Sequence, residues 1–387
     1  MSPKKLHQSQ MPVAKAALAP NIPEELTVDI LLRLPAKSIG KFRCVSKPWR
    51  CLLSDPLFIT AHLTLHLCYP QKLILFSSSP VLPSSRSIYT LTFTTADKPG
   101  SEAVLEKLTL SENILENPSS KYASIVGSCN GLVLVLGFRR ELGLRDTMYL
   151  INPTTMEVVK LAASPLVRKA VLIGGALGYD SSNDDYKIVT VSCDDSTGNE
   201  TSVDVFSLRS GSWKRINSLP YHLNFCSWVF LNGAIHWLAC SDSDSEDYSV
   251  IAFDLTSEKF DPVPIPRGEF DPIKLVDLGG CLAIVVKQTY HQMDIWVMQE
   301  YGIGQSWTKF SVATPNSFYL NKVVCLLGDD NVVVLNVEEQ KFVVHNLTEN
   351  TRRDMVVAGI GGHLRQLIGF SESLVSPIYY CQNWRAT

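Results

Sequence analysis

The sequence predicts a small all-α domain at the N-terminus followed by an all-β domain, for which a β-propeller of about six blades is the favoured architecture. Apolar residues recur at helical spacing only over residues 21–66, and beyond them short runs of β-branched and aromatic residues alternate with Gly, Asn, Asp and Ser turns. This second segment also repeats a strand–turn–strand unit at steps of 43 to 55 residues, which brackets the ~40–50 residues of a propeller blade. A two-sheet sandwich and an irregular stack of sheets are the alternatives.

Length and composition exclude several classes of protein. The chain has 387 residues, of which 45% are hydrophobic, so it can bury a substantial core in two or three domains. Its net charge of −3 gives no general attraction to nucleic acid or to an anionic membrane, and we expect neither as a partner. The longest apolar runs, such as residues 281–286, are too short to span a bilayer. Ten cysteines without a C-x-x-C pair favour reduced thiols, and therefore a cytoplasmic or nuclear location.

Four short helices are predicted within residues 21–66. Residues 1–20 lack the apolar segment of a secretory signal and are predicted to be a disordered tail. Prolines suit the first turn of a helix, carboxylates favour its N-terminal end, and Ser and Asp cap it. The first helix is predicted to start at Pro23-Glu24-Glu25 and to end before Pro35, and Ile39, Phe42 and Val45 mark the second helix. Ser46 is the predicted cap of the third helix, and Asp55-Pro56 marks the start of the fourth. The predicted domains are therefore the tail, a helical domain over 21–66 and a β domain over 67–387.

The helical domain is too small to cover its own apolar side chains. A unit of about 45 residues hides a limited fraction of its surface, so residues such as Leu31, Pro35 and Trp49 need cover from elsewhere. They either dock on the body of the same chain or form a surface for a partner.

The stretch IPEELTVDILLRLPAKSIGKFRCVSKPWRCLL resembles the F-box that opens many plant F-box proteins with an associated kelch-like domain. The resemblance runs through about 45 residues without a gap. The matching motifs are PEEL from Pro23, IL-x-RLP ending at Pro35, and FRCVSK before Trp49. The departures are Ile22, where the family usually has Leu, and Pro48, where it seldom has proline. Ile22 keeps an apolar volume and Pro48 falls in a first helical turn.

The resemblance implies docking on a Skp-type adaptor and, through it, on a cullin in an SCF-type ubiquitin ligase. An apolar surface at helical spacing agrees with this, because it fits a helix-in-groove interface. The adaptor-facing set implied position by position, part of which must also hold the bundle together, is Ile22, Pro23, Leu26, Ile30, Leu31, Leu34, Pro35, Val45 and Trp49. The basic residues of the segment are interpreted as a solvated or acid-facing rim: Arg33, Lys37, Lys41, Arg43, Lys47 and Arg50.

Repeated hairpins predict the blades of the β domain. The repeated units are YLINPTTMEVVKL, VDVFSLRSGSWKRI, VIAFDLTSEKFDPV, MDIWVMQEYGIGQSWTKF and FVVHNLTENTRRDM, with a weaker one from Ser87. Between them lie strands whose Asn-Gly pairs, at Asn130 and Asn232, suit tight turns. The phrases SCNGLVLVLG, ALGYDSSNDDYKIVTV and VFLNGAIHWLAC also resemble the kelch-like F-box-associated domain. Large aromatics usually fill the space between blades, so most of the following are expected in the core: Trp213, Trp228, Trp237, Trp296 and Trp307.

The motifs that suggest chemistry all have simpler explanations. Residues 127–131 place serine wrongly for a nucleophile elbow, and residues 301–305 lack the third glycine of a dinucleotide loop. His62 and His66 have no nearby Cys or acid ligands, so we interpret them as surface residues and expect no metal and no cofactor. The acidic stretch over residues 241–248 is interpreted as a solvated turn, because it lacks the glycine and the terminal glutamate of a calcium-binding loop.

We therefore expect a substrate receptor and not an enzyme, with the ligase reaction carried out by the cullin-bound partners while this chain raises the local concentration of a target protein. The target would bind loops on one face of the propeller. A transcription factor would need an outward helix rich in Arg, Asn or Gln, whereas Phe42, Val45 and Trp49 are apolar. The alternative function is that of a propeller-type binding scaffold, or of an enzyme acting outside a ubiquitin ligase.

Overall fold

The computed structural model describes residues 23–66, 72–78, 86–93, 103–110, 124–138, 145–162, 164–165, 170–194, 201–219, 222–240, 248–266, 271–289, 291–313, 321–327, 331–336, 341–355, 357 and 363–382. The predicted tail, residue Ile22 and residues 241–247 of the acidic stretch lie outside these ranges. Within the described part of the chain, no helix is both long and apolar enough to cross a membrane.

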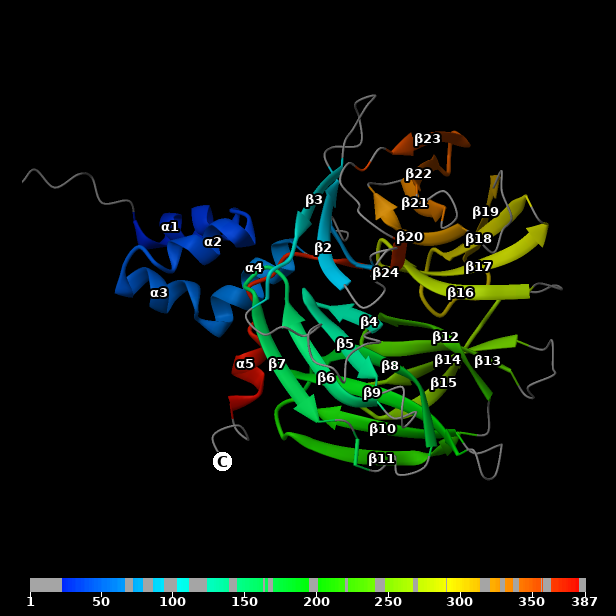
Figure 1. Ribbon diagram of the computed structural model, residues 1–387, viewed down its shortest axis with the longest axis horizontal. Helices are drawn as coiled ribbons and strands as arrows, with labels where there is room; N and C mark the ends of the chain where they lie inside the picture. The colour runs from blue at the N-terminus through cyan, green and yellow to red at the C-terminus, as the bar shows by residue number, and fades with distance from the viewer. Residues whose placement is uncertain are drawn as a thin grey trace, which may run out of the picture.

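The N-terminal bundle has four short helices. They are α1 (Glu24–Leu32), α2 (Ala36–Phe42), α3 (Lys47–Leu53) and α4 (Pro56–His66). Two start signals of the sequence form the caps that they predict: the Trp49 N–H donates to Ser46 Oγ at α3, and the Leu57 N–H donates to Asp55 Oδ1 at α4. Pro23 occupies the N-cap position of α1. Figure 1 shows the bundle beside the β domain, near the C-terminal helix α5 (Pro377–Tyr380).

The β domain consists of six four-stranded antiparallel sheets, so the predicted propeller is confirmed and has six blades (Figure 1). Blade 1 contains, from the inside outward, β24 (His363–Phe370), β1 (Lys72–Ser78), β2 (Arg86–Phe93) and β3 (Ala103–Lys107). Blade 2 contains β4 (Ser124–Cys129), β5 (Leu132–Phe138), β6 (Arg145–Asn152) and β7 (Glu157–Ala162). Blade 3 contains β8 (Ala170–Asp180), β9 (Asp185–Asp194), β10 (Thr201–Ser207) and β11 (Ser212–Leu219).

The remaining blades follow the same order along the chain. Blade 4 contains β12 (His222–Leu231), β13 (Ala234–Cys240), β14 (Tyr248–Asp254) and β15 (Lys259–Val263). Blade 5 contains β16 (Asp271–Leu278), β17 (Cys281–Thr289), β18 (Gln292–Met298) and β19 (Trp307–Ala313). Blade 6 contains β20 (Asn321–Leu327), β21 (Asn331–Asn336), β22 (Lys341–Asn346) and β23 (Thr351–Met355). The five hairpins recognised in the sequence are the two outer strands of blades 2 to 6.

Both ends of the β domain meet in blade 1. The last strand, β24, pairs antiparallel with the first, β1, in a register that joins Lys72 to Phe370 and Ser78 to His363. The innermost strands β4, β8, β12, β16, β20 and β24 contact one another in a closed ring. The propeller is therefore closed by hydrogen bonds between segments about 300 residues apart.

Each pair of neighbouring blades encloses its own cluster of buried apolar side chains. Strands are consequently buried on both faces, as in β5, where residues 132–136 are all inaccessible. Trp237 lies in the cluster between blades 3 and 4, while the other four tryptophans named above are half-buried at cluster edges. The Asn130–Gly131 and Asn232–Gly233 pairs form two-residue turns with positive φ at both positions, as their sequence predicts.

Candidate adaptor-binding site

Eight of the nine residues implied by the F-box resemblance are described, and they separate into a buried or half-buried group and an exposed group. Leu31 is only 2% exposed and packs in the core of the helical bundle with Ala36, Ile39, Leu53 and Phe58. Leu34 and Trp49 are half-buried against the same core, and Trp49 meets Phe42 edge to face with the ring centroids 5.5 Å apart. These three side chains hold the bundle together.

The exposed group provides apolar surface on the bundle, with Leu26 and Ile30 four residues apart on one face of α1. Leu26 is 55% exposed, Ile30 51% and Val45 64%, and Pro23 and Pro35 are also exposed. Large apolar side chains are costly to leave in water, so such a group is typical of a surface that a partner covers. Ile22 is not among the described residues.

Two further apolar side chains of α4 are exposed and were not singled out in the sequence. Leu57 is 82% exposed at the start of α4, and Leu65 is exposed near its end. In the segment PLFITAHLTLH, polar residues alternate with apolar ones from Thr60 to His66. This spacing does not follow the helical period, so it gave no signal that separates the buried face from the exposed one.

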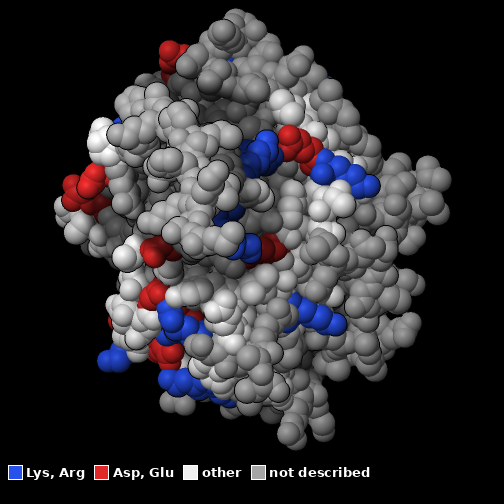
Figure 2. All heavy atoms as spheres, turned by 90° about the vertical axis from the view of Figure 1, so that its left-hand side faces the viewer, with Lys and Arg blue, Asp and Glu red and all other residues white. Residues whose placement is uncertain are grey.

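The basic residues of the bundle are distributed among separate contacts. Arg33 pairs with Asp29 on α1, Lys37 Nζ lies 2.8 Å from Glu106 Oε2 on β3, and Arg43 donates to the Leu53 carbonyl at the end of α3. Burial lowers the pKa of Arg43. Figure 2 shows basic and acidic side chains interspersed on the side of the molecule that faces left in Figure 1. This mixture agrees with a solvated rim, because on the face that Figure 2 shows the basic side chains of the described residues lie among acidic ones.

His62 and His66 are not surface residues, and this expectation was wrong. His62 is buried and stacks on His66 with the ring centroids 4.3 Å apart. Their Nε2 atoms lie 2.8 and 2.9 Å from the carbonyl oxygens of Leu34 and Leu32, respectively. Both rings thus lie against carbonyl groups at or just beyond the end of α1 that have no partner within the helix, which accounts for the buried position of His62 and the half-buried position of His66.

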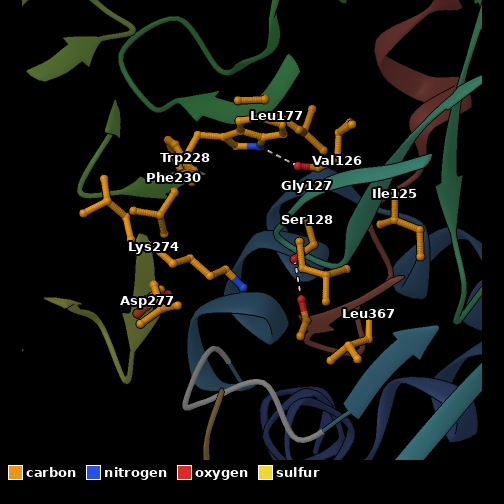
Figure 3. Close-up of a pocket in the computed structure, with 16 residues that line it drawn as sticks. Ile125, Val126, Gly127, Ser128, Leu177, Trp228, Phe230, Lys274, Asp277 and Leu367 are labelled. Atoms are coloured by element: carbon orange, nitrogen blue, oxygen red, sulfur yellow. Dashed lines mark hydrogen bonds between the residues drawn. The ribbon is translucent and has the colours of Figure 1, made fainter. Parts of the chain in front are cut away.

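A cavity lies on the propeller axis, between the inner strands of the blades. It has a volume of about 250 Å³ and is lined by the inner strands β4, β8, β12, β16 and β24. The Trp228 indole N–H donates across it to the Val126 carbonyl, Ser128 Oγ donates to the Gly369 carbonyl, and Lys274 extends into it (Figure 3). Ser128, the serine of residues 127–131, is therefore engaged in joining blade 2 to blade 1.

Two histidines of the propeller lie in surroundings that disfavour their charged form. Burial lowers the pKa of His236 and of His345 to about 4 each. His236 Nε2 lies 2.6 Å from the Tyr301 hydroxyl, at the interface of blades 4 and 5. Among the residues that the structure describes, no three His, Cys, Asp or Glu side chains gather in a way that could hold a metal ion.

The chain thus joins a helical bundle with exposed apolar side chains to a six-bladed propeller. Residues 20–60 match the F-box domain, and residues 81–379 match the F-box associated beta propeller domain. The chain belongs to the family of F-box proteins that carry this associated propeller.

Curated relatives extend over nearly the whole chain. The F-box/kelch-repeat protein At3g23880 of Arabidopsis thaliana is 30% identical over 373 residues, which cover 92% of this chain and 96% of the relative. The F-box protein CPR1 of the same plant is 29% identical over 364 residues, covering 84% of this chain and 82% of the relative. The similarity thus includes both the helical bundle and the propeller.

Proposed function

We propose that this chain is the substrate-recognition subunit of an SCF-type ubiquitin ligase. Its F-box, residues 21–66, would bind a Skp-type adaptor and through it a cullin, and its propeller domain, residues 67–387, would recruit a target protein for ubiquitination and proteasomal degradation. The observation that carries the proposal is the exposed apolar surface on a bundle that matches the F-box domain. Such a role is non-catalytic in this chain and suits a cytoplasmic or nuclear protein.

The adaptor-binding residues are proposed from exposure. Leu26, Ile30 and Val45, with Pro23 and Pro35, present side chains that a partner can reach, whereas Leu31 supports them from the core. Leu57, the most exposed apolar side chain of α4, extends the proposed surface. Leu34, Trp49 and Ile22 remain members of the proposed set, the first two through their half-exposed edges.

The target is proposed to bind the propeller face opposite the bundle. The turn at 130–131 joins the two inner strands of blade 2, and the C-terminal segment crosses it, since a Cβ atom at Gly131 would lie 2.7 Å from the Ser371 carbonyl oxygen. Part of the propeller end that carries this turn is therefore covered. Loops at the opposite end can vary without disturbing the stacked sheets or this contact, which favours that end for recognition.

A pair of isoleucines gives a direct test of the adaptor-binding surface. Ile30→Asp places a charge in the proposed interface, and we expect adaptor affinity to fall by about thirtyfold or more, because a central apolar anchor commonly contributes ~2 kcal/mol or more. Ile303, on the propeller, is 50% exposed, nearly the same as Ile30, so Ile303→Asp is the matched control and should bind the adaptor normally. Calorimetric titration with a purified Skp-type adaptor measures both. Unchanged affinity in folded Ile30→Asp would place the interface elsewhere, and no affinity in the wild type would favour a binding scaffold outside a ligase.

A further inference from the structure

The C-terminal strap, residues 371–381, connects the bundle to three blades after the ring has closed. Glu372 Oε1 lies 2.5 Å from Lys72 Nζ at the start of blade 1. Ser376 Oγ donates to Glu157 Oε2 in blade 2, and the Tyr380 hydroxyl donates to Asp184 Oδ1 in blade 3. The strap is therefore fixed along its length by polar contacts with the propeller.

The side chain of Asn152 holds the centre of the strap. Asn152 is fully buried, and its Nδ2 donates to the carbonyl oxygens of Ser373 at 3.1 Å and Val375 at 2.7 Å. Its Oδ1 accepts from the Thr154 N–H in its own turn. One buried amide thus aligns the carbonyls on both sides of Leu374, and its loss would leave them without these partners.

Leu374 completes the core of the F-box. Its side chain is buried in the same cluster as Leu31, Ala36, Ile39 and Phe58, although it lies more than 300 residues further along the chain. The next residue, Val375, packs into the cluster between blades 2 and 3, which also contains Leu63 of α4. Successive residues of the strap therefore bury one side chain in the bundle and the next in the propeller.

The turn of blade 2 leaves space for the strap by means of a glycine. Gly131 has a φ of +80°, and a Cβ atom there would collide with the Ser373 side chain and lie 2.7 Å from the Ser371 carbonyl oxygen. Gly233 occupies the corresponding Asn-Gly turn of blade 4 with a φ of +77°, but nothing lies within 4 Å of its Cβ position. The two glycines are equivalent in backbone conformation and differ in whether the strap crosses them.

We propose that Leu374 is a positioning residue for the adaptor-binding surface, placed by a strap that can dock only when the C-terminal strand has closed the propeller. A bundle of this size cannot supply a full core alone, so the missing side chain comes from the segment that follows the last propeller strand. The surface formed by Leu26 and Ile30 would then be complete only after the propeller has closed, at a fixed orientation to the propeller. The adaptor part of this inference rests on the proposed function.

The first test replaces Leu374 in the full-length protein. Leu374→Ala leaves a hole in the bundle core, and we expect about tenfold weaker adaptor binding and about tenfold faster amide hydrogen exchange in α1 and α2, because the competent bundle becomes a minor population. Leu374→Met keeps the volume and should restore both. Ile378→Ala, at an exposed position of the same strap, should change neither. Exchange in blades 3 to 5 should stay constant in all three variants.

The second test compares Gly131→Ala with Gly233→Ala. Both substitutions strain a turn with positive φ to a similar extent, so both should lower propeller stability similarly. Only Gly131→Ala displaces the strap, so only it should speed exchange in α1 and α2 and weaken adaptor binding about tenfold. Equal exchange in the bundle of both variants would overturn the proposal. If the wild type bound no adaptor, the proposed function would fail, while the exchange comparison would still decide whether the strap completes the bundle.

Discussion

At the scale of single residues, neighbours in the sequence have opposite roles. Ile30 is exposed on α1 and Leu31 is buried beneath it, so the same apolar chemistry serves a partner at one position and the core at the next. A substitution at Leu31 would disrupt the bundle and report nothing about the interface. Ile30 is for this reason the better position at which to test adaptor binding.

The buried histidine of α4 predicts a pH dependence of the bundle. Burial lowers the pKa of His62 below its usual 6.5. The hydrogen bond to the Leu34 carbonyl raises the pKa and so opposes this shift, whereas the charge of His66 lowers it further. Lys72 and Glu372 line the same small cavity and form an ion pair with each other. Because the pKa of His62 is lower in the folded than in the unfolded chain, its contribution to the free energy of unfolding is complete above pH ~6.5. The contribution decreases as the pH falls below this value, because the unfolded chain binds the proton first.

The measurement is the free energy of opening of α1 and α4, obtained from hydrogen exchange corrected for the intrinsic rate, at pH 7.5 and at pH 5.5. We expect easier opening at the lower pH in the wild type and a smaller pH effect in His62→Gln, which cannot titrate. The same pH effect in both proteins would assign it to other groups.

At the scale of elements, the blades are joined by apolar clusters and by a few buried charges. Lys187 of β9 reaches into blade 4, where its Nζ lies 3.1 Å from Glu258 Oε1, and it also pairs with Asp180 of its own blade at 3.0 Å. Burial opposes ionisation of Asp180, but hydrogen bonds from Asn183, Lys187 and Thr256 outweigh it and lower its pKa. The pair is therefore charged at neutral pH and orients blade 3 against blade 4.

Close packing between blades 3 and 4 predicts a strong effect of one added methyl group. A Cβ atom at Gly178 of β8 would lie 2.6 Å from the Phe230 ring of β12, so Gly178→Ala should lower the free energy of unfolding by about 1–3 kcal/mol. At Gly175 of the same strand the nearest atom would be 3.4 Å away, and Gly175→Ala should be close to neutral. Denaturant unfolding of the two variants measures the difference. Similar midpoints would show that the blade interface can shift to accept the methyl group.

At the scale of the whole molecule, the bundle and the propeller form one connected structure. Leu63 of α4 packs in the cluster between blades 2 and 3, and Leu374 of the strap packs in the bundle. A cut after residue 66 would therefore expose apolar surface on both sides. A decoy that binds target without the ligase is better made by charged substitutions on the exposed surface than by deletion.

Target half-life in cells tests the whole proposed pathway. The double variant Leu26→Asp, Ile30→Asp keeps the propeller and the strap contacts, so it should hold target without linking it to the adaptor and should lengthen target half-life when expressed beside the wild type. Ile303→Asp, charged at an exposed position of the propeller, should shorten it as the wild type does. If the double variant shortened the half-life as well as the wild type, the adaptor-linked mechanism would be wrong.

The sequence alone determined those features that depend on local patterns. Helical spacing up to residue 66, the caps at Ser46 and Asp55, the hairpin repeat and the two Asn-Gly turns each depend on a few neighbouring residues, and the structure contains all of them. The repeat also predicted a propeller, because a four-stranded sheet with two apolar faces must stack on its neighbours.

Only the tertiary structure decided which side chains are shared between distant segments. The pairing of β24 with β1, the burial of His62 against the end of α1 and the place of Leu374 in the F-box core depend on contacts between residues that are 28 to more than 300 positions apart. No periodicity encodes such contacts, because they join segments that are far apart in the sequence and meet only when the chain has folded. The separation of Ile30 from Leu31 has the same cause, since burial is decided by what packs against each face of a helix and not by the apolar character that both residues share.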